Sequence, residues 1–174
     1  ISNYLGYPMV QEIETILSKQ KNKIGKIIKV QIEMKQDTFL RHIKKKFNYP
    51  QTWRQKDLEI PVIFLDLGIH VFSIFKFITK LKLKKILCIQ RSHGKVENVK
   101  DDIDIYGITK GEAIIHFNFG KCLLGHKNDL NIKIYGNKGS IFWNHKQSNE
   151  YQYNDLNGNS FNIDYANATF EGNH

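Results

Sequence analysis

The sequence predicts an α+β domain in which helices pack on one face of an open, mainly antiparallel β-sheet. Patterns of helical period are confined to the first half of the 174-residue chain, and alternation with a period of two dominates the second half. Early helices followed by a run of about five to seven strands in meander order are typical of such a layer. The length suits a single domain, residues 1–174, with a sizeable core.

Two helices are predicted. The stretch from Pro8 to Lys21 is amphipathic, with an apolar stripe formed by Val10, Ile13, Ile16 and Leu17. The stretch from Pro61 to Ile78 is apolar at nearly every helical angle, so a helix there is expected to be buried almost all round. Pro61 suits the first helical position because its missing N–H is not needed there.

Alternation with a period of two predicts the strands. From Lys26 onward, polar side chains alternate with the apolar Ile28, Val30, Ile32 and Met34, which indicates a strand with one solvated face. Further strands are expected at 86–89, around residues 103–105, and at 113–119, where one face consists of Ile115, Phe117 and Phe119.

Two hairpins are expected near the end of the chain. One turns at Gly136–Gly139, between strands 130–135 and 140–143. The other turns at Asn157–Gly158, between strands 151–153 and 161–165, and Asn-Gly favours primed turns.

Charge and hydropathy argue against nucleic acid and membrane partners. The formal charge is +9, from 26 basic and 17 acidic residues, but only Arg41, Arg54 and Arg91 are arginines. Nucleic-acid readers depend on arginine and on gathered basic patches, whereas these lysines are scattered apart from Lys44–Lys46. A membrane span at 61–78 is not expected, because charged and titratable side chains interrupt it.

The two cysteines, Cys88 and Cys122, stand in apolar, strand-like runs and show no metal-binding spacing. They are interpreted as reduced core residues of a cytosolic protein.

Asp66 and His70 are the candidate functional pair. They stand four residues apart within the apolar run 61–78, so a helix would place them on one face. A carboxylate there must be paired or hydrated. The pair could be structural, functional, or two ligands of a metal, although no further His, Cys or acidic cluster completes a metal site. Just upstream, Trp53 and Arg54 could line a pocket or cover the edge of the core.

Common enzyme motifs are absent. The sequence has no Gly-x-Gly-x-x-Gly, no phosphate loop, no His-Glu-x-x-His and no Gly-x-Ser-x-Gly. The chain alone is therefore not expected to bind a dinucleotide.

Three stretches together resemble the C-terminal domain of the glucose–fructose oxidoreductase/inositol dehydrogenase (Gfo/Idh/MocA) family. They are residues 3–27, with their helix and Ile24-Gly25-Lys26-Ile27 strand entry; Trp53-Arg54 followed by Asp66-x-Gly68-x-His70; and residues 134–143. Their order and spacing match the family, and they span most of the chain.

The resemblance implies a two-domain dehydrogenase that uses NAD or NADP and acts on a sugar, cyclitol or sugar derivative. The cofactor and a catalytic lysine would belong to an N-terminal Rossmann domain that this chain lacks. By the same resemblance His70 would be the catalytic acid/base, Asp66 would position it or the substrate, and Trp53 and Arg54 would lie on the substrate side. The open sheet face would mediate homo-oligomerisation, in a cytoplasmic enzyme.

Two departures from the family bear on the substrate. The chain has Leu58-Glu59-Ile60-Pro61 where the family usually has a Gly-rich lead-in, and Ser73 where an acidic residue commonly follows the histidine. The rival interpretation is a non-catalytic binding or oligomerisation module that keeps the fold.

Overall fold

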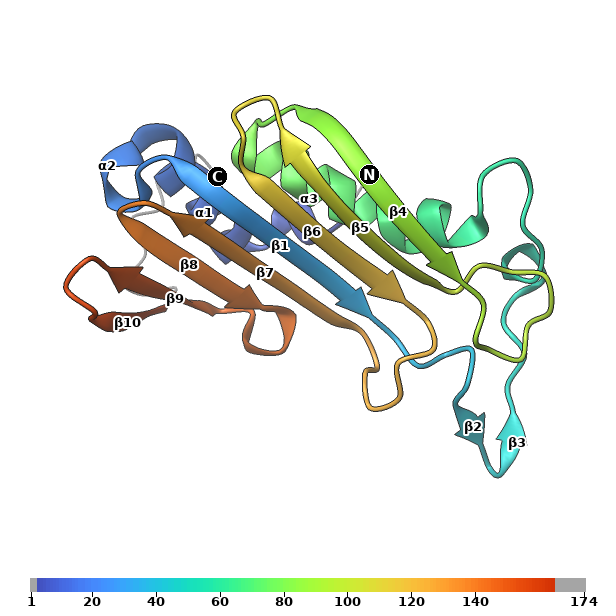
Figure 1. The fold of residues 1–174 in the computed structure, drawn as a ribbon. Coiled ribbons are helices and arrows are strands. Elements are labelled where there is room, and N and C mark those ends of the chain that lie inside the picture. Colours follow the sequence, from blue (N-terminus) through green and yellow to red (C-terminus); the bar gives the residue numbers. More distant parts are fainter. Residues whose placement is uncertain (1–2, 165–174) are drawn as a thin grey trace.

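One mixed, mainly antiparallel sheet forms the body of the computed structural model, which describes residues 3–164 (Figure 1). Its eight strands lie in the order β10-β9-β8-β7-β1-β6-β5-β4. In chain order they are β1 (Ile27–Lys35), β4 (Leu83–Arg91), β5 (Asp102–Thr109), β6 (Ile114–Gly120), β7 (Asp129–Gly136), β8 (Gly139–Asn144), β9 (Glu150–Asp155) and β10 (Ser160–Asp164). A separate small hairpin consists of β2 (His42–Ile43) and β3 (Lys46–Phe47).

The predicted fold class is confirmed, but the strands follow a simple meander only in part. Two antiparallel meanders, β4–β6 and β7–β10, flank β1 on its two sides. Strand β1 pairs antiparallel with β7 and parallel with β6. A parallel pair requires a long crossover, and here the chain passes through the helix layer, β4 and β5 between the two strands.

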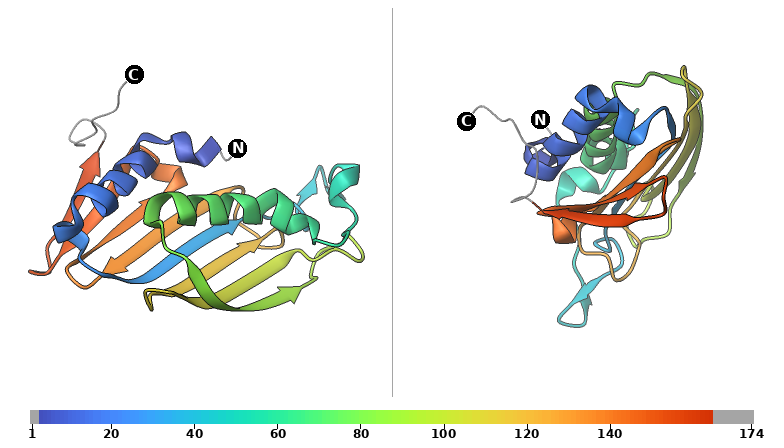
Figure 2. Two further views of the ribbon diagram at one scale, coloured as in Figure 1. Left: turned by 90° about the horizontal axis from the view of Figure 1, so that it is seen from above. Right: turned by 90° about the vertical axis from the view of Figure 1, so that its left-hand side faces the viewer.

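The helices lie on one face of the sheet (Figure 2). They are α1 (Pro8–Lys19), the short α2 (Lys21–Ile24) and α3 (Ile69–Thr79), and α3 is preceded by the π-helical segment η3 (Phe64–Gly68). Short 3₁₀ turns occur at η1 (Asn3–Gly6), η2 (Thr52–Arg54) and η4 (His145–Gln147). Both predicted helices are present, and the second contains a π turn that the sequence pattern did not predict.

The core lies between the helices and the sheet. On β6 the predicted face of Ile115, Phe117 and Phe119 is fully buried. On β1 the predicted face is buried except at Ile28, which is 49% exposed. A bulge between Ile27 and Lys29 shifts the register there and breaks the alternation.

The expectation that the second helix is buried almost all round is wrong on one side. Leu65 is 56% exposed and Ile69 is 53% exposed, and these residues stand four apart on one face. The helix rests on the sheet and lies beside α1 (Figure 2), and the face that carries Leu65 and Ile69 stays exposed within residues 3–164.

Both predicted hairpins are confirmed, β7–β8 and β9–β10, although residue 165 of the second lies outside the described residues. The β9–β10 turn differs from the primed type. Gly158 has φ +81°, but Asn157 does not have a positive φ, which a type I′ turn would require. Instead the Asp155 N–H donates to the Asn159 carbonyl at 3.1 Å and closes a three-residue loop with glycine in the left-handed position.

Candidate functional site

The parallel pair β1–β6 brings polar residues together at one edge of the sheet. Parallel strands end on the same side, so Gln36, which follows β1, lies beside Lys121, which follows β6. The Gln36 N–H donates to the Gly120 carbonyl at 2.8 Å and fixes this arrangement. Asn128 joins them because it directly precedes β7, the other neighbour of β1.

Asp66 stands on η3 and pairs with two cations. Arg54 donates from Nε to Oδ2 at 2.6 Å and from Nη2 to Oδ1 at 2.9 Å, a bidentate pair. The Lys121 Nζ lies 2.7 Å from Oδ2. The exposed side-chain fraction is 12% for Asp66 and only 3% for Lys121, so this ion pair is largely withdrawn from solvent.

Burial and charge act in opposite directions on these two groups. Burial by itself raises the pKa of Asp66, but hydrogen bonds from Arg54 and Lys121 outweigh it, so the pKa lies below its ordinary value. Burial lowers the pKa of Lys121, and the Asp66 carboxylate offsets this only in part. The lysine therefore depends on Asp66 to remain charged in its buried position.

Gly68 explains why the helix can approach the sheet so closely at this point. A Cβ added to Gly68 would lie 3.2 Å from Cζ of Phe119 on β6 and 3.3 Å from Cδ1 of Phe64. Such spacing is tighter than ordinary van der Waals contact, so a larger residue would require the Phe119 or Phe64 ring to shift by a few tenths of an ångström.

A chain of side-chain hydrogen bonds continues from Lys121 along the sheet edge. Lys121 Nζ donates to the Gln36 Oε1 at 3.0 Å, and Gln36 Nε2 donates to the Asn128 Oδ1 at 2.9 Å. Asn128 Nδ2 in turn donates to the Tyr4 hydroxyl oxygen at 2.9 Å. These amide and hydroxyl groups are the kind of side chains that can exchange hydrogen bonds with the hydroxyls of a polyol.

His70 lies beside Tyr4, at the far end of this row of hydrogen bonds. Its ring meets the Tyr4 ring edge-on, with centroids 5.1 Å apart. Burial lowers the pKa of His70, and the negative charge of Asp66 raises it by a smaller amount, so the pKa lies below its ordinary value. The imidazole is thus neutral near pH 7 and able to accept a proton.

A second histidine, His145 on η4, stands on another side of Tyr4. Their ring centroids are 5.6 Å apart. The His145 Nδ1 lies 3.3 Å from the Asn128 carbonyl oxygen, which can only accept, so Nδ1 carries the proton. The Tyr7 hydroxyl, 2.9 Å from Nε2, then donates to His145.

The structure brings together all four residues predicted for the site. Asp66 and Arg54 are in direct contact, and His70 is close enough to Asp66 for its pKa to respond to the carboxylate charge. Trp53 is 52% exposed and stacks on Arg54, whose Cζ lies 4.4 Å from the ring centroid. Trp53 therefore supports the guanidinium and does not cover the edge of the core.

Sequence reasoning missed six residues of the site: Tyr4, Tyr7, Gln36, Lys121, Asn128 and His145. Four of them lie just outside a helix or strand, and Tyr4 and His145 lie in the short 3₁₀ turns η1 and η4, where periodicity carries no information. The one available signal was Lys121, a lysine placed directly after an apolar strand with three fully buried side chains.

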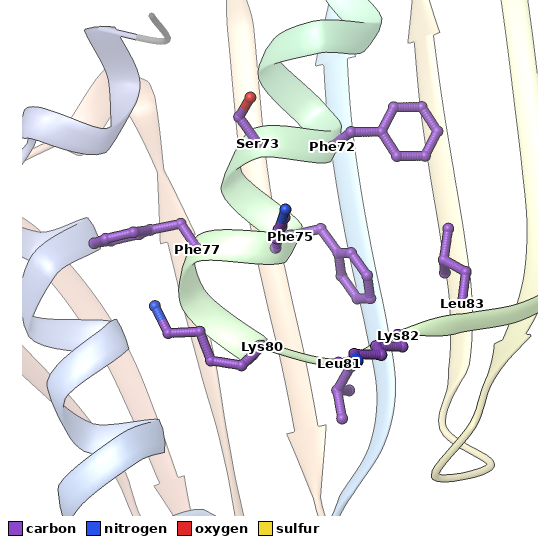
Figure 3. Close-up of a pocket in the computed structure, with 9 residues that line it drawn as sticks. Phe72, Ser73, Phe75, Phe77, Lys80, Leu81, Lys82 and Leu83 are labelled. Atoms are coloured by element: carbon purple, nitrogen blue, oxygen red, sulfur yellow. The ribbon is translucent and has the colours of Figure 1, made fainter.

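Other parts of the domain are less suited to chemistry. Within residues 3–164, no three His, Cys, Asp or Glu side chains gather into a group that could hold a metal ion. A wide pocket of about 800 Å³ lies between the second half of α3 and the start of β4 (Figure 3). Its walls are mainly Phe72, Phe75 and Leu83, with lysines but no carboxylate or imidazole.

No helix in the described part of the chain is long and apolar enough to cross a membrane.

The fold and this edge define an α+β domain with a histidine and a paired carboxylate on the helix that crosses an open sheet. The sequence matches the GFO/IDH/MocA C-terminal domain over residues 15–142. The chain belongs to this family.

Solved structures agree with the family match. An oxidoreductase from Sinorhizobium meliloti is 22% identical, with a TM-score of 0.75. The match covers 97% of this chain and 42% of that protein. Levoglucosan dehydrogenase in complex with NADH and L-sorbose is 18% identical, with a TM-score of 0.77, and the match covers 93% of this chain and 45% of that protein. An inositol dehydrogenase homolog from Azotobacter vinelandii, complexed with NADH and myo-inositol, is 14% identical, with a TM-score of 0.78 and coverage of 92% and 40%.

At these identities the similarity establishes the fold alone. The chain spans less than half the length of each of these three proteins. No curated protein matches the sequence.

Proposed function

We propose that this domain is the substrate-binding half of an NAD- or NADP-dependent dehydrogenase that acts on a sugar, a cyclitol or a sugar derivative. The observation that carries the proposal is His70, which has a lowered pKa, a charged neighbour in Asp66 and a place beside a row of amide and hydroxyl groups. Two structures of the same fold are complexes of NADH with L-sorbose and with myo-inositol, which supports this substrate class.

In this proposal His70 accepts the proton of the substrate hydroxyl when the carbinol carbon is oxidised. A neutral imidazole suits this role, because oxidation of an alcohol to a carbonyl releases that proton. Asp66 acts on His70 through its charge, since its two oxygens accept hydrogen bonds from Arg54 and Lys121. Arg54, held by Trp53, lies on the substrate side of the carboxylate.

The residues of this chain do not fit a dinucleotide. The sequence has no Gly-x-Gly-x-x-Gly turn, and a dinucleotide pyrophosphate is usually held by such a turn before a helix. The nicotinamide that accepts the hydride would therefore come from a second domain. That domain would cover the exposed stripe of Leu65 and Ile69 beside the site. We place the protein in the cytoplasm, where the free thiols of Cys88 and Cys122 stay reduced.

We further propose that two copies associate through the outer face of the sheet. On this face exposed apolar side chains of β4, β5 and β6 form two cross-strand pairs: Leu87 (63%) lies opposite Tyr106 (45%), and Ile108 (37%) lies opposite Ile114 (54%). Contiguous apolar patches of this kind tend to be interfaces between proteins. A second copy suits the patch because the same strand face would meet itself about a two-fold axis.

The alternative is a binding or oligomerisation module without catalysis. It is favoured by Ser73, which stands where an acidic residue commonly follows the family's histidine.

The test uses His70→Gln in the full-length protein that carries this domain. Glutamine keeps the size and hydrogen bonding of the side chain but cannot take the proton, so kcat is expected to fall by ~10²–10⁴. The matched control is His93→Gln, on a histidine whose side chain is 52% exposed and remote in sequence from the site. A His70→Gln enzyme that turns over at the parental rate, with the control equally active, would refute the catalytic role and leave the alternative.

A further inference from the structure

A polar pocket adjoins the Asp66 ion pairs, because Arg54 and Lys121 form part of its wall. It has a volume of about 340 Å³ and lies between the loop after β1 and the segment that leads into η2. Its walls include Gln36, Thr38, Tyr49, Gln51, Arg54 and Lys121. Two of these side chains are cations and none of the lining residues is acidic.

The electrostatics of the pocket favour an anion. Asp66 is the carboxylate that pairs with both Arg54 and Lys121, so one positive charge of the trio remains without a matching negative charge. Lys121 is 3% exposed, so solvent screens its charge poorly. Thr38 adds a possible donor, because its buried hydroxyl has no hydrogen-bond partner among the described residues.

The hydrogen bonds of Gln51 show where an anionic oxygen would sit. Its side-chain oxygen Oε1 accepts from Trp53 Nε1 at 3.0 Å and from Arg54 Nη1 at 2.7 Å. Two donors, one of them charged, therefore converge on a single amide oxygen of an exposed side chain. A carboxylate or phosphoryl oxygen in that place would make stronger, charge-assisted hydrogen bonds to the same donors.

We infer that this pocket takes an anionic substituent of the substrate, a carboxylate or a phosphoryl group, which displaces the Gln51 amide oxygen from Trp53 and Arg54. The inference rests on the proposed function and narrows it: the substrate is an acidic sugar or a sugar phosphate. Trp53 and Arg54 would then recognise the charged end of the substrate while His70 serves the reacting hydroxyl.

Two substitutions at Gln51 test this, because they have different expected effects on the binding of anionic sugars. Gln51→Glu places a permanent carboxylate where the donors converge and should weaken the binding of anionic sugars by about tenfold or more. Gln51→Ala removes the competing amide oxygen and should leave that binding equal or tighten it severalfold. Gln51 is exposed and both variants keep the Asp66 pairs, so circular dichroism should show unchanged folding for both.

The measurement is calorimetric titration of this chain with D-glucuronate, D-glucose 6-phosphate, D-glucose and inorganic phosphate at one fixed ionic strength. At least one anionic sugar should bind about tenfold tighter than D-glucose. Equal affinity of the two Gln51 variants for the anionic sugars would overturn the inference, as would D-glucose binding as tightly as they do. Inorganic phosphate that binds as tightly as D-glucose 6-phosphate would overturn the link to a sugar.

The two proposals fail separately. The titrations involve no turnover, so they decide the anion pocket even if His70→Gln in the full-length protein shows that the domain is not catalytic. Conversely, a full-length enzyme that depends on His70 but prefers neutral polyols would keep the proposed function and refute the anionic substrate.

Discussion

Replacement of Asp66 by asparagine tests the ion-pair arrangement directly. The substitution keeps the shape of the side chain but removes the charge that Arg54 and Lys121 share. Arg54 is 28% exposed and can turn toward water, whereas Lys121 is 3% exposed and would be left as a buried cation without a carboxylate. The variant should therefore lose stability mainly through Lys121.

The expected loss can be estimated from the burial of each group. Removing one partner of a buried ion pair costs ~3–5 kcal/mol. Because Lys121 keeps the Gln36 amide oxygen at 3.0 Å, we expect the lower end, about 3 kcal/mol. For a domain of this size that corresponds to a fall in Tm of about 6–12 °C.

A second substitution separates this explanation from a simple loss of hydrogen bonds. Lys121→Met removes the buried cation but leaves Asp66 in its bidentate pair with Arg54, so it should cost about 1–2 kcal/mol. If the stranded lysine is the cause, the double variant Asp66→Asn/Lys121→Met should be more stable than Asp66→Asn alone by about 1 kcal/mol or more. Urea and thermal unfolding measure all four proteins. The reasoning fails if the double variant is no more stable than Asp66→Asn.

Three further predictions follow from the same structure. The pKa of Asp66 is lowered in the folded state, so the stabilisation by its carboxylate is present above the ordinary pKa and is lost as pH falls through the folded value. The difference in free energy of unfolding between wild type and Asp66→Asn should therefore be constant at neutral pH and shrink in acid. Urea titrations at several pH values measure it. Leu87→Lys should leave the domain folded but make it monomeric, and sedimentation that finds wild type and variant in the same state would contradict the outer-face interface. The isolated chain should not bind NADH appreciably, and micromolar binding in a calorimeter would show that the reasoning from the missing Gly-rich turn is wrong.

The regular part of the fold could be predicted because strands and helices impose a period on the sequence. On β6, Ile115, Phe117 and Phe119 alternate with more polar residues, and the structure buries all three. The pairing of β1 with β6 could not be predicted, since alternation shows which face of a strand is buried but not which strand lies beside it. Ile28 shows the same limit within one strand, because a bulge moved it out of the pattern.

The site was predictable only where its residues are close in sequence. Asp66 and His70 stand four residues apart on one helix, so helical spacing alone pairs them. Lys121 reaches Asp66 only because β6 ends beside β1 under η3, and Tyr4 and Asn128 meet across 124 residues of sequence. Contacts of this kind arise from tertiary structure, and no local pattern encodes them.

The structure gives Asp66 two roles that a single activity measurement would confuse. As the partner of Arg54 and Lys121 it stabilises the fold, and as a nearby negative charge it raises the pKa of His70, against the larger effect of burial. Lower turnover in Asp66→Asn could come from either role. The pH profile separates them: if the charge acts on His70, the acid limb of kcat/KM in the full-length enzyme moves to lower pH in Asp66→Asn, measured well below the variant's Tm. If Asp66 only holds the fold, the Tm falls and the acid limb stays where it is.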